Sequence, residues 1–299
     1  MQDKKVQYKQ VDLPNGERIS YQEREGGEKK LLLIHGNMTS SKHWDLVIEH
    51  LDPSYKVYGI DMRGFGESTY YHPITSIKDF ADDVKSFVDM IGLTDFSIMG
   101  WSTGGAVAMQ FVAENPERCE KLILLASAST RGYPFYGRNA QGMPDLDHRF
   151  ATLEEFQKDI VTIVPIQHAY ATKDFDFLKA IWNALIYTKS QPNDEKYNEY
   201  LEDMCTQRNL AEVYYALNTF NISNKNNGLI DGNGLVNRIK LPVLVLRGDR
   251  DFVIPAQMVE EILEDIGDNA TFEELKDCGH SPLVDDLNQL INKITRFLD

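Results

Sequence analysis

The 299-residue sequence has few cysteines and no long apolar run. Its three cysteines, Cys119, Cys205 and Cys278, are widely spaced and form no C-x-x-C pair, which argues against a disulfide framework and against a zinc site. No apolar stretch is long enough to span a bilayer. The first ten residues are polar and mixed in charge, unlike a secretory signal. We therefore expect a cytoplasmic protein without a metal site.

Basic residues are also scarce. There are 31 Lys and Arg against 46 Asp and Glu, and the formal net charge of −15 disfavours nucleic acids and anionic membrane surfaces as partners. The 42% hydrophobic and 26% charged content is that of an ordinary folded protein rather than a disordered one. Charge alone names no substrate.

Short apolar runs alternate with segments of helical period over residues 1–129 and 239–299. This alternation predicts right-handed βαβ units, and hence a mostly parallel, twisted, eight-stranded sheet flanked by helices. An antiparallel hairpin is expected at 5–13 and 18–22, around Pro14-Asn15-Gly16. The other strands are expected at 31–34, 56–60, 96–99, 122–126, 243–246 and, at one edge, 271–275. The helices are expected at 77–91, 106–114, 258–266 and 287–297.

Residues 130–238 break the alternation. They open with a loop rich in Gly and Pro and then show helical segments at 153–164, 175–187, 194–204 and 210–220, without a clear strand. We expect a helical cap inserted between the two parts of an α/β core. The cap is rich in aromatic side chains, most of which should pack its helices together, while some line a substrate pocket.

The sequence Gly100-Trp101-Ser102-Thr103-Gly104 lies between a predicted buried strand and a predicted helix. That setting is the one a G-x-S-x-G nucleophile turn requires, because the serine hydroxyl must project above the carboxyl edge of the sheet. An ordinary Gly-Ser turn without chemistry is the alternative. Ser102 is therefore the predicted nucleophile.

A nucleophilic serine needs a base, and His280 is the best placed of seven histidines because it follows the last predicted strand and lies downstream of serine and acid. His35 is expected to hold its loop by hydrogen bonding. The base needs an orienting carboxylate, which Asp251 or Asp249 could supply after the strand at 243–246. The G-x-x-D-x-x-x-P spacing favours Asp251. The other five histidines, most of them expected at the surface, are His43, His50, His72, His148 and His168.

Acyl transfer also needs donors for the oxyanion. One should be the backbone N–H of Thr103, the residue after the nucleophile. The other should come from the loop that begins at His35-Gly36, where the backbone N–H of Asn37 is favoured and that of Met38 is the alternative.

These residues together resemble the α/β-hydrolase superfamily, in the subgroup with a helical cap. The matching segments occur in family order and comprise His35-Gly36-Asn37, residues 61–68, residues 100–104, residues 248–255 and Cys278-Gly279-His280. In such proteins residues 61–68 form a structural turn without a catalytic role. The loop His35-Gly36-Asn37 is similar to that of haloalkane dehalogenases, but those enzymes use an aspartate nucleophile where this chain has Ser102.

We therefore expect a serine esterase that needs no cofactor and cleaves a small or medium apolar acyl ester through an acyl-enzyme. Lactone, amide or C–C bond hydrolysis on the same three residues remains open, and so does a ligand-binding protein without turnover. C–C bond hydrolysis of a dienone acid would require a cation for the substrate carboxylate, for which the cap offers Arg131, Arg138, Arg149 and Arg208. Oligomeric state is not indicated.

Overall fold

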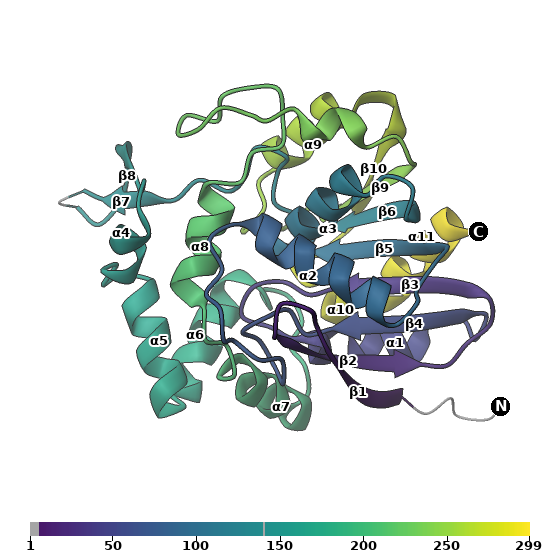
Figure 1. The fold of residues 1–299 in the computed structure, drawn as a ribbon. Helices are drawn as coiled ribbons and strands as arrows, with labels where there is room; N and C mark the ends of the chain where they lie inside the picture. Colours follow the sequence, from purple (N-terminus) through teal and green to yellow (C-terminus); the bar gives the residue numbers. More distant parts are fainter. Residues whose placement is uncertain (1–5, 140) are drawn as a thin grey trace.

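The computed structural model describes residues 6–139 and 141–299 and is built around one eight-stranded sheet (Figure 1). The strand order is β1-β2-β4-β3-β5-β6-β9-β10, and all neighbours pair in parallel except β1 with β2 and β2 with β4. The predicted mostly parallel, eight-stranded sheet is thus confirmed, with β10 at the expected edge. Lys5, at the start of the expected hairpin, lies outside the described residues. The strands are β1 (Val6–Asp12), β2 (Arg18–Arg24), β3 (Lys29–Ile34), β4 (Tyr55–Ile60), β5 (Phe96–Trp101), β6 (Cys119–Leu125), β9 (Val243–Gly248) and β10 (Ala270–Leu275).

The central strands are apolar at successive positions because both faces of the sheet are covered. Leu31 and Leu33 of β3 pack in the hydrophobic cluster on one face, whereas Leu32 and Ile34 pack in the cluster on the other. Successive side chains of a strand point to opposite faces, so a strand buried on both sides must be apolar throughout. Each parallel strand therefore delivers its carboxyl end to the same edge, from which the loops that carry the site emerge.

Helices cover the two faces. The first cluster includes side chains of α2 (Ile77–Met90), α3 (Thr103–Glu114) and α9 (Ala256–Ile266), and the second includes side chains of α1 (Asp45–His50) and α11 (Leu287–Leu298) (Figure 1). The short elements η1 (Ser41–Trp44), α1, η2 (Leu235–Arg238), η3 (Gly267–Asn269) and α10 (Pro282–Asp285) were not expected, because too few residues repeat in them to show a period. Among the described residues, no helix combines the length and apolarity that crossing a membrane would require.

The segment between β6 and β9 contains α4 (Leu153–Gln157), α5 (Ile163–Thr172), α6 (Phe175–Leu185), α7 (Asp194–Met204) and α8 (Leu210–Asn218). The prediction of one continuous helix at 153–164 was wrong, because α4 ends at Gln157 and α5 begins at Ile163. Asp159 accepts hydrogen bonds from the N–H groups of Val161 and Thr162 at 3.0 and 3.2 Å, which turns the chain out of α4. Pro165 lies in the first turn of α5, where its missing N–H costs no helical hydrogen bond.

This segment also contains a hairpin, so the expectation of no strand within it was wrong as well. β7 (Tyr136–Arg138) and β8 (Pro144–Arg149) pair antiparallel and project away from the sheet on the left of Figure 1. β7 has three residues with a glycine at its centre, and β8 is mostly polar. Neither strand therefore has the alternation of apolar residues that marks a strand in sequence.

Residues 203–209, here called the clasp, fasten this segment to the sheet's loops. Asp203 accepts hydrogen bonds from Ser40 Oγ at 2.6 Å and from Ser40 N at 3.0 Å, and Gln207 Nε2 donates to Asn37 Oδ1 at 2.7 Å. The clasp therefore connects the segment between β6 and β9 to the loop after β3. Further bonds join it to the turn after β4: Gly66 N to Thr206 Oγ1 (2.9 Å), Arg208 N to Gly64 O (2.9 Å) and Asn209 Nδ2 to Arg63 O (2.8 Å).

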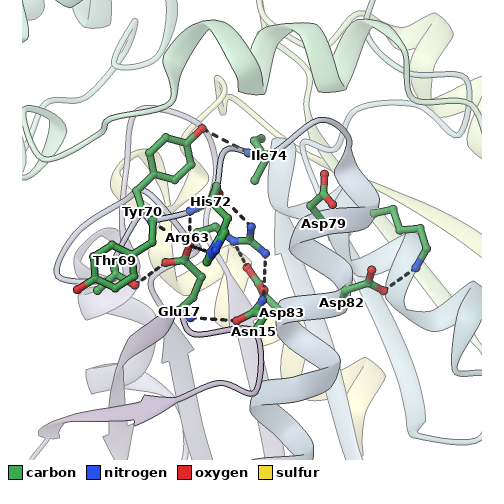
Figure 2. Close-up of polar contacts among 12 residues, drawn as sticks. Asn15, Glu17, Arg63, Thr69, Tyr70, His72, Ile74, Asp79, Asp82 and Asp83 are labelled. Atoms are coloured by element: carbon green, nitrogen blue, oxygen red, sulfur yellow. Dashed lines mark hydrogen bonds and ion pairs between the residues drawn. The ribbon is translucent and has the colours of Figure 1, made fainter.

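The turn after β4 is fixed from the opposite side by a buried ion pair. Arg63 donates from Nε and Nη2 to the two carboxylate oxygens of Asp83 on α2, each at 2.7 Å, and from Nη1 to the main-chain oxygen of His72 at 3.0 Å (Figure 2). Asn15 Nδ2 donates to Asp83 at 2.8 Å, and Glu17 accepts the N–H of His72 at 2.7 Å. These contacts stabilise the turn.

Candidate active site

Ser102 lies at the sharp turn between β5 and α3. Its backbone has φ 55° and ψ −117°, a conformation that costs a non-glycine residue about 1–3 kcal/mol and persists only where its surroundings impose it. Two hydrogen bonds do so: Ser102 N donates to Leu125 O at 2.9 Å, and Gly105 N donates to Ser102 O at 3.0 Å. The turn presents the serine side chain at the carboxyl edge of the sheet.

Small residues around Ser102 let β3, β5 and α3 approach one another closely. A Cβ on Gly100 would lie 2.1 Å from the carbonyl oxygen of Gly104, and a Cβ on Gly104 would lie 2.2 Å from that of Ile34. Real Cβ atoms do not approach a carbonyl oxygen so closely, so any side chain at either glycine would push the helix away from the sheet. The glycines of G-x-S-x-G therefore have a packing reason in this fold.

His280 and Asp251 meet above β9 and β10. His280 Nδ1 lies 3.0 Å from Asp251 Oδ2 and 3.2 Å from Oδ1, and both side chains are buried. Burial by itself would raise the pKa of Asp251, but the charge and hydrogen bond of His280 and the N–H groups of Ile254 and Val253 outweigh it and hold the pKa below its usual value. The carboxylate is thus kept ionised against the imidazole.

The other candidate acid, Asp249, does not contact His280. Its carboxylate is exposed and accepts the N–H of Cys278 at 3.2 Å, which ties the loop after β9 to the loop that carries the histidine. Gly248 brings these loops together, because a Cβ there would lie 2.1 Å from the carbonyl oxygen of Cys278.

Trp101 is a residue of the site that sequence reasoning missed. Its indole Nε1 donates to the main-chain oxygen of His280 at 2.9 Å, and its ring lies 5.8 Å from the His280 ring. The ring also packs edge-on against Trp44 at 6.1 Å. The middle residue of the serine turn therefore fixes the histidine loop. The sequence does show an indole next to the serine, but it does not show which residue the indole contacts, because that residue lies 179 positions away.

The loop after β3 brings Asn37 and Met38 to the same place. Both line the cavity that contains Ser102 and His280, and Met38 has a positive φ of 59°. Thr103 is the first residue of α3, and the N–H groups of a first helical turn have no acceptor within the helix. The structure therefore places the expected oxyanion donors, Asn37 and Thr103, beside the serine. Gln207 in the clasp, which holds the Asn37 side chain, was not foreseen.

His35 holds its loop, as expected. Its Nε2 accepts the N–H of Met62 at 2.9 Å and its Nδ1 lies 2.7 Å from Gly36 O, so the neutral ring bridges the loops after β3 and β4. Complete burial lowers the pKa of His35 to about 4. Most of the other histidines were expected at the surface, and His50, His72, His148 and His168 are indeed exposed.

His43 departs from that pattern because it is buried. Its ring stacks on Tyr200 at 4.1 Å, and its Nδ1 lies 3.3 Å from Asp203. The partner residues come from α7, whose position relative to η1 cannot be read from the sequence of either segment. His43 therefore belongs to the contact between the clasp and the loop after β3.

Two cavities meet at Ser102. The larger, of about 820 Å³, is lined by Ser102, Asn37 and Thr103 together with cap residues, and the smaller, of about 300 Å³, contains both Ser102 and His280. Of the cap aromatics, Tyr214 lines both cavities. Within residues 6–139 and 141–299, no three His, Cys, Asp or Glu side chains are close enough together to hold a metal ion. The aromatics of residues 130–238 that line the larger cavity are Tyr133, Phe135, Tyr136, Phe150, Phe156 and Tyr214, and those that line the smaller one are Trp182 and Tyr214.

Relatives of known function are hydrolases. The chain is 25% identical over 268 residues to a 2-hydroxy-6-oxononadienedioate/2-hydroxy-6-oxononatrienedioate hydrolase of Paraburkholderia phymatum, covering 88% of this chain and 84% of that protein. It is 21% identical over 289 residues to a pimeloyl-(acyl-carrier protein) methyl ester esterase of Photorhabdus laumondii, covering 93% and 95%. The first of these relatives is named as a hydrolase and the second as an esterase.

Solved structures share the fold. An esterase from Exiguobacterium antarcticum superposes with a TM-score of 0.73 at 17% identity, covering 98% of this chain and 99% of that one. A thermophilic esterase from Thermogutta terrifontis gives a TM-score of 0.70 at 19% identity, covering 98% of each chain. A model of the α/β-hydrolase fold matches residues 29–287, and the chain therefore belongs to the α/β-hydrolase family.

Proposed function

We propose that this chain is a serine hydrolase that needs no cofactor and cleaves a carboxylic ester through an acyl-enzyme. One observation carries the proposal: Ser102, held in a strained turn, and His280, paired with Asp251, line a single small cavity. A merely structural serine has no need of a strained backbone in the same cavity as a histidine paired with a carboxylate.

In the proposed reaction Ser102 Oγ attacks the ester carbonyl while His280 Nε2 accepts its proton. Asp251 keeps the other proton of the imidazole on Nδ1 and stabilises the imidazolium. The N–H groups of Asn37 and Thr103 hold the oxyanion. His280 then protonates the leaving alcohol, and water repeats the sequence to release the acid.

The lining of the cavities supports a small or medium, largely apolar substrate. In the smaller one, Met38, Ile166, Ile181 and Leu185 surround the polar groups at Ser102. Such a lining binds hydrocarbon, while the few polar groups orient the scissile bond. We propose that the segment between β6 and β9, residues 130–238, acts as the cap of this pocket, and that the enzyme acts on a small molecule in the cytoplasm.

C–C bond hydrolysis is the second candidate. The likeness to a hydrolase of that kind, over 88% of this chain, favours it, and the same serine, histidine and aspartate could serve it. Lactonase or amidase activity would use the same residues. A ligand-binding role without turnover is the remaining rival.

Hydrolysis of p-nitrophenyl esters of graded acyl length by the wild type and by Ser102→Ala tests the proposal. We expect turnover by the wild type and a loss of at least about 10³-fold in the variant. A C–C hydrolase would instead cleave a dienone acid substantially faster than any ester. Equal ester rates in the two proteins would rule out Ser102 as the nucleophile, and absence of turnover on every ester, lactone, amide and dienone acid would favour the ligand-binding role.

A further inference from the structure

The smaller cavity is apolar apart from a few groups, and its lining contains one positively charged side chain and no negatively charged one among the described residues. Arg138, at the end of β7, lines it together with Ser102 and His280. Across residues 6–139 and 141–299, no aspartate or glutamate and no other lysine or arginine lines this cavity. Arg138 is therefore the one permanently charged side chain among the described residues that line this cavity, and it is exposed to solvent.

Three other arginines of the cap, Arg131, Arg149 and Arg208, already have partners. Arg131 pairs with Asp265 on α9 at 2.8 Å. Arg149 donates to Asn218 Oδ1 at 2.9 Å and to Asn218 O at 2.7 Å, and Arg208 donates to the main-chain oxygen of Ser68. None of the three lines either cavity. They fasten the cap and are not available to a substrate.

Arg138 is different. In the described part of the chain its side chain makes one hydrogen bond, from Nη1 to the main-chain oxygen of Gly142 at 3.4 Å, and it has no carboxylate partner. A guanidinium carries five N–H donors, so most of them remain available. Arg138 also lines the larger cavity, so it lies where the two cavities join.

Acidic side chains do line the larger cavity, and each already has a partner within the protein. Glu154 pairs with Lys158, and Glu155 accepts the N–H groups of Ala151 and Thr152 at 2.9 and 2.8 Å. Asp159 accepts N–H groups of the turn that ends α4. Lys158 and Arg138 line the same cavity, so three carboxylates against two cations leave its lining with a net negative charge, which disfavours an anion there. An anionic group of a ligand is therefore favoured in the smaller cavity, against Arg138.

We infer that Arg138 binds a carboxylate of the substrate, and that the preferred substrate is an ester whose carboxylate is separated from the scissile bond by an apolar chain. A half-ester of a dicarboxylic acid is the simplest example. The arginine can accept a carboxylate through two parallel N–H···O bonds, which sets the distance between the carboxylate and the bond cleaved. This inference rests on the proposed function, because it takes Ser102 as the reactive group.

The test compares half-esters with neutral esters of equal length. The kcat/KM values are measured for monomethyl succinate, adipate, suberate and sebacate and for the matching methyl alkanoates, with 6-acetoxyhexanoate as a substrate whose carboxylate lies on the alcohol side. We expect the wild type to prefer the anionic partner of at least one pair by about two- to fivefold, the upper part of the range for an exposed ion pair. The preference should shrink as salt is added, since Arg138 is exposed.

Three variants separate the explanations. Arg138→Gln should abolish the preference by lowering kcat/KM for the anionic esters more than for their neutral partners, while Arg138→Lys should keep part of the preference. Lys173→Gln removes a surface charge that lines neither cavity and should change nothing. The inference is overturned if the wild type shows no preference in any pair, or if Arg138→Gln lowers the rates on anionic and neutral esters equally. In both cases continued hydrolysis of neutral esters would leave the proposed function standing, whereas inertness of the wild type on every ester would refute that function itself.

Discussion

Replacing Asp251 with asparagine changes the charge at one carboxylate oxygen and leaves the shape of the side chain almost intact. Asp251 Oδ1 accepts the N–H groups of Val253 and Ile254 at 2.8 and 2.9 Å. The asparagine oxygen should keep these two bonds. Its amide NH₂ must then point at His280 Nδ1, where a donor meets a donor unless the imidazole moves its proton to Nε2.

An imidazole with its proton on Nε2 cannot accept the proton of Ser102. We therefore expect kcat for ester hydrolysis near neutral pH to fall by about 10⁴-fold, the order found when a triad histidine is held in the wrong tautomer. The free energy of unfolding should fall by only about 1–2 kcal/mol, because a single charge-assisted hydrogen bond is weakened while the backbone bonds remain. Initial rates and denaturant unfolding measure the two quantities.

Asp249→Asn is the matched control. Asp249 stands two residues away in the same loop and contacts Cys278 N, not His280. Its variant should retain activity within about threefold, since exposed polar contacts contribute little. The reasoning is refuted if Asp251→Asn stays active while folded, or if Asp249→Asn loses activity to the same extent.

Two further predictions follow from buried contacts of the site. Trp101→Phe keeps an aromatic ring but removes the N–H that holds His280 O, so kcat should fall by about tenfold with KM little changed. The control is Trp44→Phe, which should not change kcat because Trp44 Nε1 has no hydrogen-bond partner among the described residues. Equal effects of the two substitutions would contradict a positioning role for Trp101. The second prediction concerns His35, whose pKa is about 4 in the folded protein and about 6.5 in the unfolded chain. Between pH 4 and pH 6.5 the unfolded chain therefore binds one more proton than the folded protein. The stability that His35 contributes is complete above pH 6.5 and is lost as the pH falls toward 4. Urea unfolding of the wild type and of His35→Gln at pH 7.5, 5.5 and 4.5 measures this effect. The free energy of unfolding of the wild type, relative to that of the variant, should fall toward acid pH by about 3 kcal/mol over the whole window. Parallel pH profiles of the two proteins would show that His35 is not the titrating group.

The sheet could be predicted because its signals are local. An apolar run such as 31–34 reports burial on both faces wherever the strand lies in the sheet, and each run is followed by the loop that leaves the carboxyl edge. The turn at Ser102 was equally local, because Gly100 and Gly104 are required by contacts within one strand–turn–helix unit and its neighbouring strand. The pairing of Asp251 with His280 followed from knowing that both loops leave the same edge.

The contacts between cap and core could not be predicted in the same way. Gln207 reaches Asn37 across 170 positions of sequence, and Asp203 reaches Ser40 across 163. Each residue, taken alone, reads as an ordinary polar residue near a helix end. Their partners are set by how the cap packs on the sheet, which no periodicity records. The sequence likewise does not show that Arg138 lacks a carboxylate partner among the described residues while Arg131 has one, because these pairings depend on the folded structure.

The most direct test of the central claim is covalent labelling of the folded protein with a fluorophosphonate, followed by intact mass and peptide mapping. An activated serine should take up one probe per chain, on Ser102, and Ser102→Ala should take up none. Asp251→Asn should label far more slowly than the wild type, because its histidine no longer accepts the serine proton. Labelling of the Ser102→Ala variant at the wild-type rate, or a wild type that hydrolyses esters yet carries its label elsewhere, would contradict the account.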